Sequence, residues 1–340
     1  MNLLPYYLFA RKTAAGTDPG GGGTTPPPLG NTGTFTMHLR KGREVAFGPL
    51  VMDMVSTRSD MIMHREYPQD LFVTNDLPDY NKLDQRLAGI PEDDTGYLTF
   101  DYEGTTMTDL KFGNVGEPLF ETALQRFIDI AQYTKARRTA LRIGFYGLTI
   151  RAWHTADVAR YNAEGKYDRL MPHVDFITPS VYLPYAQEEK GAARVKQYLE
   201  DNVKASLAYK DRFPHLEAVI YVDERIHVSN DNIDTVASEI AGRTLSYASL
   251  FHRAEVMAEH VAIIKNTVYN GVSPDGIMFY TRGTENGLRF KPYGVDFHWG
   301  SHIGIPTPIT GTETQTVAQY NDFFHTMVTA IFSRIDPPAN

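Results

Sequence analysis

The sequence predicts an α/β protein whose strands form a (β/α) TIM-like barrel. Short apolar runs rich in β-formers alternate with amphipathic segments, as they do where crossover helices join parallel strands. Polar and aromatic residues recur where successive runs end, which favours a barrel with its site on that face over an open doubly wound sheet. The length of 340 residues suits a single barrel domain.

The composition restricts the classes of function. A net charge of −8 leaves no basic stripe for phosphates, so we expect no nucleic-acid partner. The lack of cysteine excludes disulfides, thiolate catalysis and cysteine-bound metals. No apolar run approaches a membrane span, and the N-terminus lacks the features of a signal peptide. We expect cytoplasmic synthesis, no membrane partner and, if the protein leaves the cell, release by lysis.

The chain divides into three parts. Residues 1–15 form an arm that contains the aromatic segment Pro5–Ala10, and residues 16–33 form a linker rich in glycine and proline. The barrel domain occupies residues 34–340. The arm is either a docking segment for a protein partner in a larger assembly or a disordered or self-packed terminus.

The strands of the barrel domain are predicted from their β-forming content. Glu44–Val55 and Asp70–Asn75 are apolar and β-like, and Gly96–Gly104 is an aromatic run that ends in acidic residues. Later runs contain mainly branched and aromatic residues. They are 140–146, 174–183, 215–222 and 275–280.

The helices between these strands are predicted from apolar residues at helical spacing. Glu117–Arg138 shows this spacing most clearly, with Phe120, Leu124, Phe127 and Ile128 on one face. The other predicted helices are 155–170, 188–210, 246–268 and 314–333.

The stretch Gly96–Gly104, which reads Gly-Tyr-Leu-Thr-Phe-Asp-Tyr-Glu-Gly, has the strongest functional signal. Residues two apart in a strand point to the same side, so Asp101 and Glu103 are expected to project together while Tyr102 faces away. Two close carboxyl groups in a cleft tend to leave one a proton donor and the other an anion. That arrangement suits glycosidic bond cleavage. The alternative is a strand that simply ends in a solvated acidic turn.

Four predicted strand ends have a shared chemistry. They read Phe100-Asp-Tyr-Glu103, Ile143-Gly-Phe-Tyr146, Pro179-Ser-Val-Tyr182 and Gly276-Ile-Met-Phe-Tyr280. Their order and composition resemble the hyaluronidase family of glycoside hydrolases, which includes bee-venom and mammalian enzymes. The resemblance spans about residues 44–285 and implies a distorted (β/α) barrel with about seven strands.

The resemblance also implies roles for individual residues. Glu103 would be the general acid, and Asp101 would hold the acetamido group of the substrate. Tyr146 and Tyr182 would position that group, and Tyr280 would form an apolar wall. The implied reaction is substrate-assisted and retaining, because the acetamido oxygen attacks its own anomeric carbon and the protein supplies no nucleophile or cofactor.

The implied substrate is a polysaccharide that contains N-acetylhexosamine. After Glu103 the family pattern continues with a tryptophan-containing segment, whereas this chain continues Gly-Thr-Thr-Met. The polymer is therefore left open between hyaluronan and a bacterial capsule or cell-wall glycan. Additional candidates for substrate binding follow strand ends or offer aromatic faces to sugar rings. They are Tyr185, Tyr221, Asp223 and Arg282.

We expect no metal site. His298 and His302 are four residues apart, but Gly300 between them disfavours the helix that would bring them together. His252 and His260 are predicted to be surface or packing residues.

Two other functions stay open at this level. The chitinase-like barrels end a strand in Asp-x-Asp-x-Glu, and this chain has Thr99 at the first of those positions. The second alternative is a non-catalytic glycan-binding component of a larger particle, such as a phage tail in the virion, because a barrel can keep its fold after losing its activity.

Overall fold

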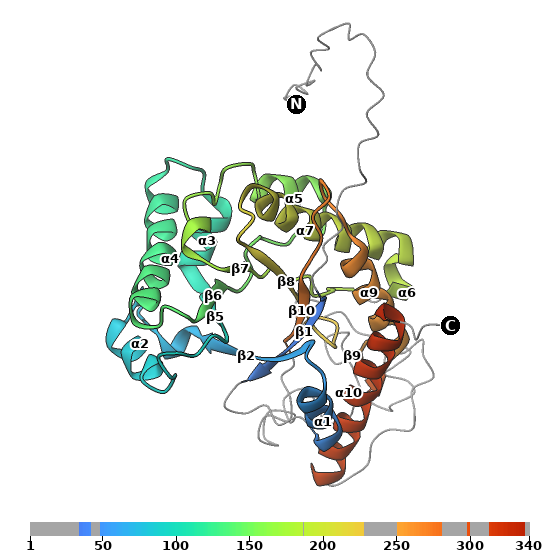
Figure 1. The fold of residues 1–340 in the computed structure, drawn as a ribbon. Coiled ribbons are helices and arrows are strands. Elements are labelled where there is room, and N and C mark those ends of the chain that lie inside the picture. Colours follow the sequence, from blue (N-terminus) through green and yellow to red (C-terminus); the bar gives the residue numbers. More distant parts are fainter. Residues whose placement is uncertain are drawn as a thin grey trace, which may run out of the picture.

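A computed structural model of the chain describes residues 34–41, 48–185, 187–227, 250–280, 298–299 and 313–336. In these parts, a ring of strands is surrounded by helices (Figure 1). The predicted arm and linker and Arg282 lie outside the described residues.

Seven parallel strands form the ring, in the order β6-β5-β2-β1-β10-β8-β7. A parallel bridge between Tyr146 and Thr178, just beyond β6 and β7, joins the two ends of this order. The structure therefore confirms the predicted distorted barrel. The strands are β1 Thr36–Lys41, β2 Met61–Pro68, β5 Tyr97–Asp101, β6 Arg142–Phe145, β7 Phe176–Ile177, β8 Glu217–Val222 and β10 Gly276–Phe279.

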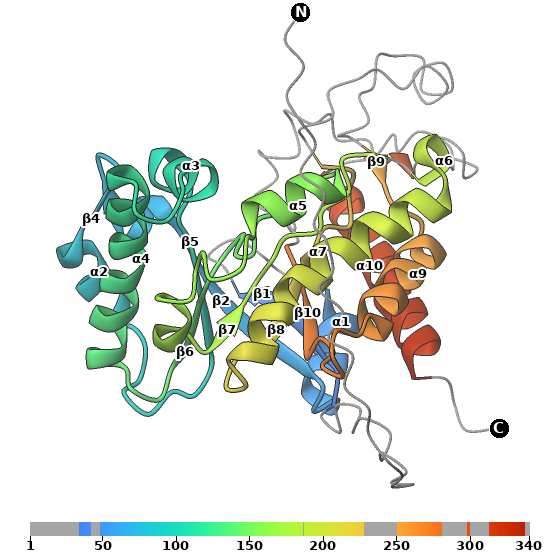
Figure 2. The ribbon, with the colours of Figure 1, turned by 90° about the horizontal axis from the view of Figure 1, so that it is seen from above.

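The helices cover the outside of the ring. Figure 2 shows α2, α3 and α4 beside β5 and β6, with α9 and α10 across the barrel from them. No helix within the described ranges is long and apolar enough to span a membrane. The helices are α1 Pro49–Thr57, α2 Tyr80–Leu87, α3 Gly104–Phe112, α4 Pro118–Arg137, α5 Thr155–Tyr161, α6 Gln187–Lys190, α7 Ala192–Arg212, α9 Ala254–Asn266 and α10 Glu313–Ile335.

Short elements complete the described chain. Two pairs of two-residue strands lie outside the barrel sheet, and two single 3₁₀ turns occur. They are β3 Val73–Thr74 with β4 Leu77–Pro78, β9 Leu250–Phe251 with β11 His298–Trp299, and the turns Gln69–Leu71 and Met171–His173.

Several predicted elements are confirmed with small changes at their ends. The helical spacing predicted over 117–138 forms α4, whose Phe120, Leu124 and Phe127 are buried against the sheet. The strands predicted at 140–146, 215–222 and 275–280 are β6, β8 and β10, and the closing helix is α10. Strong periodicity with packing on one face thus predicts these elements correctly.

Other predicted elements are wrong. Within the expected strand 44–55, the described part is the start of helix α1, which has Pro49 in its first turn, where the missing N–H costs nothing. Most of the expected strand 70–75 is a 3₁₀ turn followed by the short β3. The strand expected over 174–183 is reduced to β7. Beyond it, Thr178 and Ser180 still form single bridges to Tyr146 and Tyr221 on either side.

Three predicted helices are also shorter or interrupted. The helix expected over 155–170 ends as α5 at Tyr161, where the Asn162 amide bonds the carbonyls of Val158 and Ile150. The 188–210 segment is divided into α6 and α7 at Gly191. The 246–268 segment contains strand β9 before α9.

The strands separate two cores because their side chains alternate. On β5, Leu98 and Phe100 belong to the apolar core between sheet and helices. Tyr97 and Thr99 instead point into the barrel, where both contact His64 on the neighbouring strand β2. A second, smaller apolar cluster inside the ring comprises Tyr182, Val219, Tyr221 and Met278, with Tyr146 and Tyr280 packed on it.

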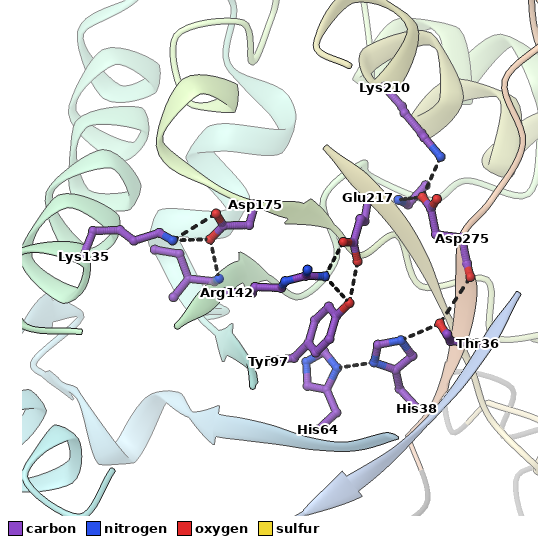
Figure 3. A network of polar contacts seen from close by, with 12 residues as sticks. Thr36, His38, His64, Tyr97, Lys135, Arg142, Asp175, Lys210, Glu217 and Asp275 are labelled. Atoms are coloured by element: carbon purple, nitrogen blue, oxygen red, sulfur yellow. Dashed lines mark hydrogen bonds and ion pairs between the residues drawn. The ribbon is translucent and has the colours of Figure 1, made fainter. Parts of the chain in front are cut away.

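The amino-terminal end of the barrel interior contains a histidine chain (Figure 3). The Thr36 hydroxyl donates to the Asp275 carbonyl, so its Oγ1 accepts from Nε2 of His38 at 2.8 Å. The Nδ1 of His38 then accepts from Nδ1 of His64 at 3.0 Å, and Nε2 of His64 accepts from the Thr99 hydroxyl at 2.8 Å. Burial lowers the pKa of His38 to about 3 and that of His64 well below its usual range, so both rings are neutral.

A charged group sits at the same end. The Tyr97 hydroxyl donates to Oε2 of Glu217 at 2.6 Å and accepts from Nη1 of Arg142 at 2.6 Å, while Arg142 also pairs with Glu217. Figure 3 shows these side chains pointing toward one another beside the histidine chain. Each of the three side chains is therefore hydrogen-bonded to the other two, although Arg142 is exposed to solvent.

Candidate active site

The acidic pair lies at the carboxyl end of β5. Asp101 is the last residue of the strand and is partly buried. Tyr102 turns outward and is buried, with its ring stacked on Phe127, so the predicted alternation holds at this point. Glu103 follows the strand with an exposed side chain and precedes α3. Gly104 has a φ of +75°, a left-handed conformation that glycine adopts without strain and that turns the chain into the helix.

Asp101 has an environment that favours its protonated form. Burial raises the pKa of this carboxyl well above its usual range, and the negative charges of Glu66 and Glu103 add to the effect, while Arg40 opposes it. The Oδ1 atom of Asp101 is buried and has no hydrogen-bond partner among the described residues. The resemblance assigns the proton donor to Glu103, whereas burial and the neighbouring negative charges favour a bound proton at Asp101.

Four tyrosines face one another beside the carboxylates. The ring centroid of Tyr146 lies 5.3 Å from that of Tyr221, 6.0 Å from that of Tyr182 and 6.2 Å from that of Tyr280. The rings of Tyr182 and Tyr280 are 5.8 Å apart. These residues come from β8 and from the ends of β6, β7 and β10, so the barrel brings together tyrosines that are far apart in the sequence.

Burial of these tyrosines has electrostatic consequences. Desolvation raises the pKa of Tyr146, and the charges of Asp101 and Glu103 act in the same direction, which places this phenol near both carboxylates. Burial likewise raises the pKa of Tyr182, whose hydroxyl has no hydrogen-bond partner within the described part of the chain. The tyrosines are therefore neutral hydrogen-bonding groups.

Two charged residues of the site were not predicted from the sequence. Glu66 on β2 has a fully buried side chain, and its Oε1 lies 3.3 Å from Nη2 of Arg40 on β1. Its Oε2 accepts a hydrogen bond of 3.3 Å from the Tyr221 hydroxyl. The Arg40 guanidinium also stacks 4.6 Å from the ring centroid of Tyr280. A charged residue within an otherwise β-like run, as in Met61–Pro68, is the sequence feature from which such inward-facing charges could have been predicted.

A second cationic group lies beside the tyrosines. The Arg151 guanidinium is 5.1 Å from the ring centroid of Tyr182, and its Nη2 donates to Nε2 of His227 at 3.0 Å. Because Arg151 has no acceptor, this bond fixes Nε2 of His227 as the unprotonated nitrogen. The His227 ring stacks on Tyr182 with centroids 5.6 Å apart.

The remaining predicted binding residues are placed differently. Tyr221 is fully buried beneath the other tyrosines, and Asp223 is buried, with its Oδ1 accepting from the backbone N–H of Arg225. The charge of Asp223 acts on Tyr182, so it lies near the site. Tyr185 instead contacts Trp153, with ring centroids 4.9 Å apart, and is separate from the four-tyrosine cluster.

Three of the four histidines considered for a metal site lie within the described residues. The described ranges contain no group of three or more His, Asp or Glu placed to hold an ion. His298 lies in the short strand β11, and His302 is outside the described residues. His252 and His260 are buried packing residues, and Nε2 of His260 is 2.9 Å from Oε1 of Gln187.

Comparisons with known proteins identify no family. No protein-family model matches the chain, and no curated protein matches its sequence. Among solved structures, bee venom hyaluronidase aligns at 12% identity with a TM-score of 0.49, over 76% of this chain and 96% of that chain. A structure of the same enzyme with a hyaluronic acid tetramer aligns at 12% identity with a TM-score of 0.46, over 76% and 95% of the two chains. At these values the matches assign no activity, so the case for function rests on the residues at the strand ends.

Proposed function

We propose that this protein is a glycoside hydrolase that cleaves an N-acetylhexosamine-containing polysaccharide by a substrate-assisted, retaining mechanism. The observation that supports this most is the meeting of Asp101 and Glu103 with Tyr146 and Tyr182 at one mouth of the barrel. These are the residues for which the strand-end motifs resemble the hyaluronidase family.

The exposed position of Glu103 suits a general acid. Its carboxyl group stands beyond the strand, where a polymer lying across the barrel mouth can present the oxygen of its scissile bond. Glu103 gives its proton to that oxygen as the glycosidic bond breaks. The acetamido oxygen of the same sugar attacks the anomeric carbon, so the new bond forms within the substrate.

Asp101 acts on the other end of the acetamido group. As the amide oxygen attacks, positive charge develops on the amide nitrogen, and Asp101, which has first lost its own proton to solvent, accepts the hydrogen bond of that N–H. The phenol of Tyr146, near both carboxylates, can donate to the attacking oxygen and hold it in line. Water then opens the cyclic intermediate with Glu103 as the base, which returns the original configuration.

The tyrosine faces supply a surface for the sugar. The partly exposed rings of Tyr146 and Tyr280 can cover the C–H face of a pyranose, and Arg40 beneath Tyr280 holds that ring in place. Tyr185, Tyr221, Asp223 and Arg282 remain proposed substrate-binding residues. Tyr221 is buried, so its contribution would be to support the rings above it.

The test is hydrolysis of a panel of N-acetylated polysaccharides by the wild-type protein and by Glu103→Gln. The panel contains hyaluronan, chondroitin, chitin oligomers and bacterial capsule and wall glycans. We expect cleavage of at least one polymer and a fall of about 10²-fold or more in the variant, because the isosteric amide cannot donate the proton. Glu117→Gln, at an exposed carboxylate before α4, is the matched control and should keep full activity.

Two results would contradict the proposal. One is binding of a polymer without cleavage, unchanged in Glu103→Gln, which would favour a glycan-binding component of a larger particle. The other is cleavage that Glu103→Gln leaves intact, which would place the catalytic acid elsewhere.

A further inference from the structure

A third carboxylate lies beneath the proposed catalytic pair. Glu66 is on β2, and the register pairs it with Thr99 of β5, two residues before Asp101 on the same inward-facing side. Its side chain is completely buried, so Glu66 cannot itself meet a polymer. Any contribution to the reaction must therefore act through a neighbour.

Glu66 is held in place from two sides. Arg40 contacts its Oε1 at 3.3 Å, and the Tyr221 hydroxyl donates to its Oε2 at 3.3 Å. The Thr99 hydroxyl lies beside that of Tyr221 and donates to Nε2 of His64 in the histidine chain. The carboxylate is thus fixed by contacts that continue into the rigid interior of the barrel.

The charge state of Glu66 follows from its contacts. The Arg40 guanidinium forms an ion pair with this carboxyl group and the Tyr221 phenol donates a hydrogen bond to it, and both contacts favour its ionised form. Asp101, in contrast, forms no ion pair with any described residue. Of the two carboxyl groups, Asp101 therefore binds a proton more tightly than Glu66, and it becomes a base once it has released that proton to solvent.

We propose that Glu66, held by Arg40 and Tyr221, is a positioning residue that strengthens Asp101 as the base for the substrate's amide N–H. A carboxylate with a fixed negative charge beside it binds a proton more tightly, so it accepts the amide hydrogen more strongly as the anomeric bond forms. When the intermediate opens, Asp101 returns this hydrogen to the amide nitrogen. No proton is gained or lost by Glu66.

Other groups also face Asp101 and must be separated from Glu66. They are Arg40 from β1, Asp70 from the 3₁₀ turn, Glu103 after β5, Tyr146 after β6 and Tyr221 from β8. Among the charges that raise the pKa of Asp101, Glu66 has the largest effect and Asp70 a smaller one. Asp70→Asn therefore offers a control, since it removes one negative charge that also acts on Asp101, but from an exposed position.

The test measures the ionisation of Asp101 directly and the activity separately. Aspartate labelled with ¹³C at the carboxyl carbon is titrated by NMR in the wild type, Glu66→Gln and Asp70→Asn, with Asp101→Asn to assign the signal. We expect the Asp101 midpoint to move to lower pH in Glu66→Gln, and further than in Asp70→Asn. The acid limb of kcat/KM should move in the same direction, and its plateau should fall about tenfold.

The catalytic role of Glu66 rests on the proposed function. The NMR titration and the hydrolysis assay together show which of the two is wrong if one fails. Hydrolysis with an unmoved Asp101 midpoint in Glu66→Gln, or one moved no more than in Asp70→Asn, overturns the role of Glu66 alone. A moved midpoint without hydrolysis of any polymer overturns the proposed function. If Glu66→Gln does not fold, the double variant Arg40→Gln, Glu66→Gln leaves no buried charge unpaired and should still lower the Asp101 midpoint.

Discussion

The two ends of the barrel interior use similar residues in opposite ways. At the amino-terminal end, His38, His64 and Tyr97 have their polar atoms bonded to fixed partners. At the carboxyl-terminal end, Asp101 and Tyr182 have buried oxygens with no partner in the described chain. Satisfied networks stabilise a fold, whereas buried groups without partners reduce its stability and are kept where a ligand will pair with them. The difference locates the proposed site at the carboxyl-terminal end.

Removing a member of the closed network should have the largest effect on stability. His38→Ala leaves Thr36 and His64 without their partner and opens a cavity, so we expect a loss of about 2–4 kcal/mol in the free energy of unfolding. Urea denaturation measures this loss. The exposed His154→Ala should change stability by less than about 0.5 kcal/mol. A His38→Ala variant as stable as wild type would show that the network has no structural role.

Replacing a tyrosine by phenylalanine at each end of the barrel interior should change the free energy of unfolding by smaller amounts, which differ between the two ends. Tyr97→Phe loses bonds to Glu217 and Arg142, so we expect a loss of about 1–2 kcal/mol. Tyr182→Phe removes a hydroxyl that lacks a partner among the described residues, so stability should stay the same or rise slightly. The hydrolysis rate of Tyr182→Phe should fall about tenfold, because in the wild type that hydroxyl is available to bind substrate. Equal destabilisation by both changes would remove the contrast between the ends.

The parts of the fold that could be predicted from the sequence are the helices and strands with one apolar face packed in the core. Alternation over 96–101 and helical spacing over 117–138 are visible because the apolar core lies outside the ring and repeats the same pattern. The strands β1 and β2 were missed because His38, Arg40, His64 and Glu66 face the barrel interior. Their inward polar residues interrupt the apolar run by which strands are recognised.

Part of the site could be predicted in the same way. Asp101, Glu103, Tyr146, Tyr182 and Tyr280 follow apolar runs, so strand ends identify them. Their proximity depends on closure of the ring through the bridge between Tyr146 and Thr178, which no local pattern encodes. The partners of Asp101 on neighbouring strands could not be predicted, because register is set by packing across the sheet.

The carboxyl-terminal end of the barrel keeps groups that lower the free energy of unfolding but serve the proposed reaction. The variant Asp101→Asn tests this most directly. The pKa of Asp101 is raised on folding, so its ionisation destabilises the native state as the pH rises from about 4 through that raised value. The amide cannot ionise. Below about pH 4 the carboxyl is protonated in both folded and unfolded states, so no difference of this origin remains there.

The measurement is the melting temperature of Asp101→Asn and wild type at pH 4 and pH 8, together with hydrolysis of the cleaved polymer. Asp84→Asn, which changes a half-exposed carboxylate paired with Arg137, is the control for loss of a charge. We predict that Asp101→Asn melts higher than wild type at pH 8, that most of this gain disappears at pH 4, and that hydrolysis falls about 10²-fold. An Asp101→Asn protein that melts no higher at pH 8 and cleaves at the wild-type rate would contradict the account.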